Sequence, residues 1–288
     1  MELFQYPYMQ RALIGALVIG LAAPALGIYL VQRRLALIGD GVGHVALTGV
    51  GAGLLLNRSP VLVAVVAAII GAVAIELVRA RGRTSGDLAL ALLFYGGIAG
   101  GVMLVGLSDS TNANLNAYLF GSLTTISSTD LTAIAVLGAA ITVVMLALRP
   151  ALFAVCHDEE YARVSGLPVR TLNLLIAVTT AVTVTIAMRA VGVLLISALM
   201  VVPVATAQQV TRGFRSTMTA AMALGLFAAG GGVFVAANVD TAPGASVVLL
   251  AIASFLVVAV AGAAWRVLRR RRAPVAAPAP EPHEVVLR

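Results

Sequence analysis

The sequence predicts an all-α, polytopic membrane protein because of its composition and the length of its apolar runs. Of the 288 residues, 60% are hydrophobic and only 11% are charged, whereas soluble domains are about 45–50% apolar and about 25% charged. Runs such as 61–75 and 176–186 are long and contain no charged residue, which favours membrane helices over the shorter alternating strands of a barrel. We expect residues 1–272 to form one transmembrane domain surrounded by lipid, and 273–288 to form a disordered, Ala/Pro-rich cytoplasmic tail.

About nine segments have roughly the 20 apolar residues that a helix needs to cross a bilayer. Each ends at a polar or basic break in the sequence. The predicted spans are 11–31, 36–56, 60–78, 87–107, 130–148, 171–188, 191–209, 217–236 and 245–266. The breaks between them contain, in order, Arg33 and Arg34; Asn57 and Arg58; three arginines within 79–83; the polar segment 108–129; the charged segment 149–170; Arg189; Arg212 and Arg215; and the turn at 238–243.

The distribution of basic residues predicts the orientation of these spans. All 19 basic residues are arginine, and with this assignment 16 of them fall on one side of the membrane. Only Arg11, Arg58 and Arg189 fall on the other side. Basic residues accumulate on the cytoplasmic side, so we expect an N-terminus outside and a cytoplasmic C-terminus in the cell membrane.

Missing residue types and motifs exclude several functions. Without a lysine, the chain cannot form a Walker A phosphate loop, so any ATPase must be a partner chain. The single Cys156 excludes an internal disulfide and a thiolate cluster. No His-Glu-x-x-His, Gly-x-Ser-x-Gly or paired-carboxylate motif occurs in the spans, so we expect no enzyme activity. Orientation explains the basic residues, so we expect no nucleic-acid partner, and we expect no tightly bound cofactor.

Residues 37–49 place an acid and an imidazole inside an apolar, glycine-rich segment. On a helix, Asp40, His44 and Thr48 share one face because they are four residues apart. His44 lies about nine residues from the basic end of its span, or roughly 13 Å along a helix, which is near the middle of a bilayer. Ionisable groups at that depth are costly and usually functional.

Three interpretations of this polar stripe remain open. Asp40 can be an interfacial residue while His44 bonds to a neighbouring helix; the pair can relay protons; or it can bind a passing divalent cation, for which carboxylate and imidazole are suitable ligands. One Asp and one His are too few for a four-coordinate site, but a two-fold dimer would supply two of each.

Glycine pairs at four-residue spacing predict close helix packing near the stripe. They are Gly39 and Gly43, Gly49 and Gly53, and Gly97 and Gly101. Close packing would bring the stripe against a second helix. For the other acids near the membrane, Glu76 and Asp87, we expect surface ion pairs with the arginines at 79–83.

The sequence also predicts the structure of two connections between spans and a role for one proline. The outer segment 108–130 combines asparagines with the apolar sequence 118–121, which suggests a folded or re-entrant segment more than a slack linker. The inner segment 158–168 predicts a short helix closed by Gly166 and Pro168. In the seventh span, Pro203 removes a backbone hydrogen bond and is a plausible transport hinge.

Four stretches, in this order and spacing, resemble the permease subunits of ABC importers for zinc, manganese and iron, the ABC-3 family. The first, 33–49, is similar to the family's Gly-Asp-Ala-x-Ser-His-Ala-x-x-Pro-Gly. The second and third are 87–94 and 118–121, and the fourth, 191–207, is similar to Val-Gly-x-Leu-Leu…Ala-Leu…Pro-x-Ala-Thr-Ala. The resemblance covers about residues 10–265.

The resemblance implies a helical permease similar to the vitamin B12 importer type. It would act as a homodimer with cytoplasmic ABC ATPase subunits and an extracytoplasmic metal-binding protein. Asp40 and His44 would line the metal path, and Asp158, Ala162 and Gly166 match the family's coupling helix, which docks on the ATPase.

The sequence departs from the family pattern at three positions. Gly43 stands where the family usually has Ser, and Thr48 stands where it usually has Pro. Asp87 lacks its common acidic neighbour. These departures weaken any assignment of a particular metal.

The predicted function is therefore import of a divalent metal, driven by ATP hydrolysis on a partner chain. The alternative is a proton- or sodium-coupled secondary transporter that uses Asp40 and His44 as its relay.

Overall fold

The computed structural model describes residues 6–80, 86–108, 118–121, 126–239 and 241–272. Every regular element in these ranges is a helix, as the apolar runs predict. The helices are α1 (Pro7–Gln32), α2 (Ile38–Leu55), α3 (Pro60–Ala80), α4 (Gly86–Leu107), α6 (Ser128–Ala147), α7 (Arg149–His157), α8 (Glu159–Val164), α9 (Val169–Ala187), α10 (Val193–Val210), α11 (Phe214–Val239) and α12 (Pro243–Arg272). The predicted tail, 273–288, lies outside the described residues.

Each of the nine predicted spans coincides with one helix. In the described part of the chain, eight helices are long and apolar enough to cross a membrane, and the ninth, α10, has a shorter apolar stretch at Leu195–Val210. Helix α12 continues past the predicted end of its span to Arg272. The helix predicted within 158–168 is α8, whereas α7, which precedes it, was not predicted.

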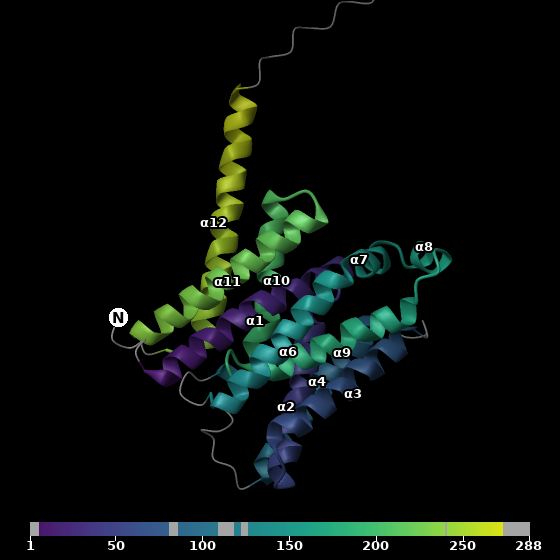
Figure 1. Cartoon of the computed structure of the whole chain (residues 1–288), viewed down its shortest axis with the longest axis vertical. Coiled ribbons are helices and arrows are strands. Elements are labelled where there is room, and N and C mark those ends of the chain that lie inside the picture. Colours follow the sequence, from purple (N-terminus) through teal and green to yellow (C-terminus); the bar gives the residue numbers. More distant parts are fainter. Residues whose placement is uncertain (1–5, 81–85, 109–117, 122–125, 240, 273–288) are drawn as a thin grey trace, which may run out of the picture.

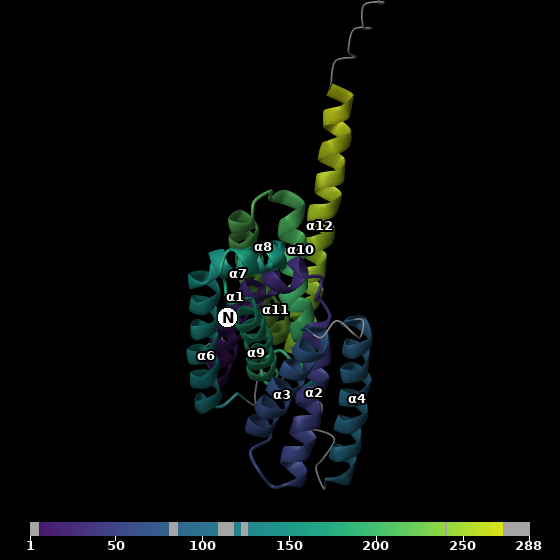
Figure 2. The same cartoon turned by 90° about the vertical axis from the view of Figure 1, so that its right-hand side faces the viewer.

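The bundle has a buried centre and exposed edges. Helix α1 packs against α6, α10 and α11. Of the residues in its membrane-spanning stretch, 72% are buried inside the protein, whereas only 17% are buried in the corresponding stretches of α4 and α12. Helix α2 lies between α3 and α4 and packs extensively on both (Figures 1 and 2). In both views α12, drawn in yellow, extends away from the end of the molecule where α2, α3 and α4 lie.

The predicted glycine pairs occur where helices approach closely. A Cβ on Gly97 of α4 would lie 2.6 Å from the backbone carbonyl carbon of His44. A Cβ on Gly53 of α2 would lie 2.7 Å from the Cα of Pro60 at the start of α3. Real Cβ atoms are not found at such distances, so only glycine permits these contacts. The polar stripe is therefore held tightly against α4, as the spacing predicts.

Tyr118–Gly121 form a folded segment at the end of the bundle that we predict to face outward. Residues 118–120 make a helical turn, and Gly121, with a φ of 76°, packs against the backbone carbonyl of Ala190. Gly192, with a φ of 93°, packs in turn against the backbone of 119–121. The rest of the segment predicted to fold here, 109–117 and 122–125, lies outside the described residues.

An ion pair ties the start of α6 to the connection between α9 and α10. Asp130 Oδ1 accepts a hydrogen bond from Arg189 Nη1 at 2.7 Å. The other carboxylate oxygen, Oδ2, completes a capping box by accepting from the Ser127 backbone N–H at 3.0 Å. Asp130 therefore stabilises both its own helix and the contact with Arg189.

Asp130→Ala should lower the free energy of unfolding by about 1 kcal/mol, because it removes the helix cap and the ion pair together. The melting temperature of the purified protein in detergent would fall by roughly 2–4 °C. Thr132→Ala is the control, because the Thr132 hydroxyl is exposed and bonds only to the backbone of its own helix. Equal melting temperatures for the two variants would contradict this assignment.

Candidate functional site: a polar stripe on α2 and a cavity beside α8

His44 and Thr48 of the stripe both contact α4. The His44 ring meets the Phe94 ring edge-on, with their centroids 4.4 Å apart. The Thr48 hydroxyl donates to the Gly97 carbonyl at 2.8 Å, which anchors α2 to α4. Thr48 therefore has a structural role in joining α2 to α4.

Asp40 lies where α2, α4 and α10 converge. It is in the first turn of α2, a position where the helix dipole favours a carboxylate. Its side chain is partly buried and lines a cavity of about 260 Å³ with residues of α4 that include Phe94 and Tyr95. On the other side, α10 packs against this turn, where a Cβ on Gly39 would lie 3.4 Å from Ser197 Oγ.

His44 is buried, with 8% of its surface exposed, and its Nδ1 atom is buried without a hydrogen-bond partner. A buried polar atom without a partner costs about 1–3 kcal/mol, so it is retained only where something else compensates for it. This is the state expected of a nitrogen that receives a ligand. Asp40 lies one helical turn before His44 on α2.

Within the described residues, no group of three or more His, Cys, Asp or Glu side chains could hold a metal ion. Asp40 and His44 together offer one oxygen-type and one nitrogen-type ligand, a set that suits a divalent transition metal. Two ligands are too few for a four-coordinate site. Such a site would hold an ion weakly.

The second predicted site is α8, and each of its three named residues has a local structural role. Asp158 caps the helix by accepting from the Tyr161 backbone N–H at 2.9 Å. Ala162 is fully buried. Gly166 has a φ of 81°, and the Leu167 N–H bonds to the Ala162 carbonyl at 3.0 Å, the arrangement of a Schellman cap. Asp158 therefore caps the start of α8, Ala162 packs the helix against the rest of the protein, and Gly166 ends it.

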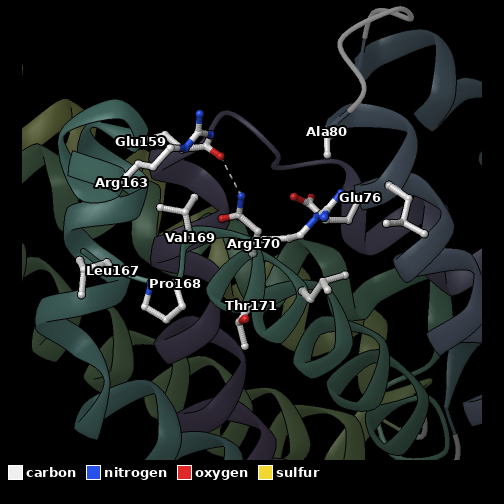
Figure 3. Close-up of a pocket in the computed structure, with 12 residues that line it drawn as sticks. Glu76, Ala80, Glu159, Arg163, Leu167, Pro168, Val169, Arg170 and Thr171 are labelled. Carbon is white, nitrogen blue, oxygen red and sulfur yellow. Dashed lines mark hydrogen bonds between the residues drawn. The ribbon is translucent and has the colours of Figure 1, made fainter. Parts of the chain in front are cut away.

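A cavity of about 520 Å³ separates α8 from α3 and lies over the start of α9. In Figure 3, Glu159 and Arg163 of α8 lie across the cavity from Glu76 of α3, with Arg170 of α9 between them. Glu76 is paired with Arg79, Oε1 to Nη2 at 2.9 Å, as predicted, but the acid is buried and does not lie on the surface as expected. Asp87, the other acid in that prediction, has no described side chain.

One hydrogen bond joins α8 to α9 across the edge of this cavity. Asn173 Nδ2 donates to Glu159 Oε1 at 3.1 Å, which is the dashed line in Figure 3. The break after α1 reaches the same region, because Arg34 lines a smaller cavity together with Arg79 of α3. Connections that the charge bias places on one side of the membrane therefore meet in space.

The family model described as the ABC 3 transport family matches residues 5–262. The chain belongs to this family. As a member of the ABC 3 family it is a membrane transport subunit, and the ATPase is a separate subunit. This match confirms the family resemblance of the four motifs and the predicted helical permease fold.

Relatives within the ABC 3 family differ in the metal that their names state. The manganese transport system membrane protein MntC of Halalkalibacterium halodurans is 30% identical over 87% of this chain and 86% of its own. The high-affinity zinc uptake system membrane protein ZnuB of Haemophilus influenzae is 31% identical over 83% of this chain and 91% of its own. The two identities are nearly equal, so overall similarity does not identify the metal.

A solved structure of PsaBC from Streptococcus pneumoniae, in complex with Fab, contains a chain with the same fold. The two chains superpose with a TM-score of 0.80 at 29% identity, covering 88% of this chain and 92% of that one.

Sequence reasoning missed two groups at the site of this ABC 3 family member. Phe94 and Ser197 lie within two of the four family-like stretches, but nothing in their spacing indicates that α4 and α10 both reach the stripe on α2. Pro203 lies within α10, which continues through it.

Proposed function

We propose that this chain is the membrane-spanning subunit of an importer that moves a divalent transition-metal ion, zinc, manganese or iron, into the cytoplasm. Asp40 and His44 are its transient ligands. The observation that carries the proposal is the buried, unpartnered Nδ1 of His44, one helical turn from the Asp40 carboxylate. Membership of the ABC 3 family and the manganese and zinc relatives support it.

The transport route follows from this assignment. The ion arrives from an extracytoplasmic metal-binding protein and passes a gate near 108–130. It meets Asp40 and His44 briefly, and it leaves when the cytoplasmic side opens around the Pro203 hinge. The N-terminus is outside, and the cytoplasmic cavity and α8 face the ATPase subunits, with Asp158, Ala162 and Gly166 shaping the helix that docks on them.

Two copies of the chain assemble as a homodimer. One copy supplies two ligands, and a tetrahedral site needs four, so a two-fold axis beside α2 completes the set with the partner's Asp40 and His44. The cavity beside Asp40 leaves the site open on one side, which is consistent with completion by a second chain.

The test is metal uptake and metal content in cells that lack this chain, compared across zinc, manganese and iron. We expect uptake of one of the three to fail and to be restored by the gene. A second arm inactivates the ATPase partner, which should stop the same uptake. Uptake that survives this inactivation but stops when the ion gradient collapses would replace the proposal with a secondary transporter.

A further inference from the structure

The second half of α12 extends beyond the rest of the bundle. The buried residues of α12 all lie within 243–251, and the helix packs against α10 and α11. Among the described side chains of 252–265 none is buried, and Val257 and Val260 are 67% and 69% exposed. Both views show this half leading away from the other helices (Figures 1 and 2). Its surroundings are therefore lipid or another molecule, because the described part of the chain does not cover it.

The length of α12 places its last residues at the level of the lipid headgroups. Its apolar part, Pro243–Trp265, has 23 residues, or about 34 Å of helix, which is enough to cross a hydrocarbon core of about 30 Å. Trp265 ends this part and is 63% exposed, and tryptophan is typical of the membrane interface. The complete helix has 30 residues, or about 45 Å, close to the thickness of a bilayer with its headgroups, about 40–45 Å.

The end of α12 is basic around its whole circumference. Positions 266, 269, 270, 271 and 272 are all arginine, and 241–280 contains no acidic residue that could neutralise them. Four consecutive positions occupy more than one turn of a helix, so 269–272 place arginines on every side. A helix that docks in a protein groove presents one face to it, whereas headgroups surround a membrane helix on all sides. The pattern therefore favours lipid over a protein partner.

We propose that the end of α12 is a binding site for anionic phospholipids, in which the arginines of 266–272 hold lipid phosphates of the leaflet that the charge bias makes cytoplasmic. Clusters of about four to eight basic residues next to a membrane helix attract anionic headgroups, and guanidinium groups bind phosphate oxygens in pairs. This role accounts for the part of α12 that continues past its span. It goes beyond the proposed function, because it does not depend on the transported ion.

The fluorescence of Trp265 tests this proposal, because Trp265 is the only tryptophan of the chain and directly precedes the first of these arginines. The full chain is reconstituted in phosphatidylcholine vesicles that contain a minor fraction of phosphatidylglycerol. An equal mole fraction of either lipid carries brominated acyl chains, which quench tryptophan on contact. We expect brominated phosphatidylglycerol to quench about two- to fivefold more than brominated phosphatidylcholine, because one basic residue at an anionic surface contributes roughly a factor of five.

The fourfold variant Arg269→Gln, Arg270→Gln, Arg271→Gln and Arg272→Gln should quench equally with the two lipids. Glutamine removes the charges while its helix propensity is close to that of arginine, so the helix is kept. Raising the salt concentration should weaken the preference of the wild-type chain in the same way. The salt arm needs no variant, so it tests the proposal even if the fourfold variant does not fold.

Two double variants remove the same number of charges at different places. Arg270→Gln with Arg271→Gln should lower the preference for phosphatidylglycerol. Arg212→Gln with Arg215→Gln, at the exposed connection between α10 and α11, should leave it unchanged.

Three results would overturn the proposal. The first is equal quenching by the two lipids in the wild-type chain at low salt. The second is an equal loss of preference in the two double variants, which would reflect net charge and not a site on α12. The third is a fourfold variant that keeps the preference but no longer binds the purified ATPase subunit, which would make the end of α12 a docking segment for protein.

Discussion

His44→Ala should reduce metal uptake at least about a hundredfold. Changing an outer-shell partner of a metal ligand costs roughly 10–100-fold in affinity or activity, and removing the ligand itself should cost no less. The expected result is loss of uptake with a normal amount of protein in the membrane, because alanine also removes a buried atom that has no partner. Uptake of the labelled ion into whole cells, measured beside membrane expression, is the readout.

His157→Ala is the matched control for this experiment. His157 ends α7, is exposed and stacks on Phe153 with ring centroids 5.5 Å apart, so its loss should leave uptake unchanged. Retained uptake in His44→Ala would remove His44 from the metal path. A variant absent from the membrane would show instead that His44 serves the fold.

Gly166→Val should reduce ATP-driven uptake about five- to thirtyfold. Gly166 has a φ of 81° and closes α8, and a residue with a Cβ pays about 1–2 kcal/mol in that conformation, which corresponds to a factor of about 5–30. A Cβ at this position meets no atom within 4 Å, so added bulk does not complicate the result. The end of α8 would change while Asp40 and His44 remain undisturbed.

Gly166→Asn separates backbone conformation from side-chain loss, because asparagine tolerates a positive φ. We expect it to retain most of the uptake. The readouts are metal-stimulated ATP hydrolysis and uptake by the reconstituted complex, both of which should fall together in the valine variant. Equal activity of the two variants would show that the cap of α8 does not affect coupling.

The sequence predicted the spans well because hydropathy is a local property. Nine apolar runs became nine helices, and their ends differ from the predicted ends by a few residues except at α12. Helix α7 was missed because it has nine residues and only two buried apolar side chains, Leu152 and Val155. That pattern cannot be distinguished from a loop.

The sequence predicted only those features of the candidate site that depend on one helix, α2. The spacing of Asp40, His44 and Thr48 fixes their common face, and the glycine pairs indicate that another helix lies against it. Which helices meet that face is a tertiary property, so neither the contact of Phe94 with His44 nor the packing of Ser197 against Gly39 could be predicted. The hydrogen bond of Thr48 to Gly97, which gives this residue a packing role, was equally inaccessible.

The cavity beneath α8 has a consequence for biosynthesis. Its walls come from residues 76 to 174, and at translation rates of about 5–20 residues per second the ribosome needs roughly 5–20 s to add the second wall after the first. During that interval the residues of α8 and α9 that line the cavity opposite Glu76 have not yet been synthesised. Its partner, Arg79, is only three residues away, so the acid is neutralised as soon as α3 inserts. The cavity beside α8 can therefore be completed late without leaving the Glu76 charge unpaired in the nascent chain.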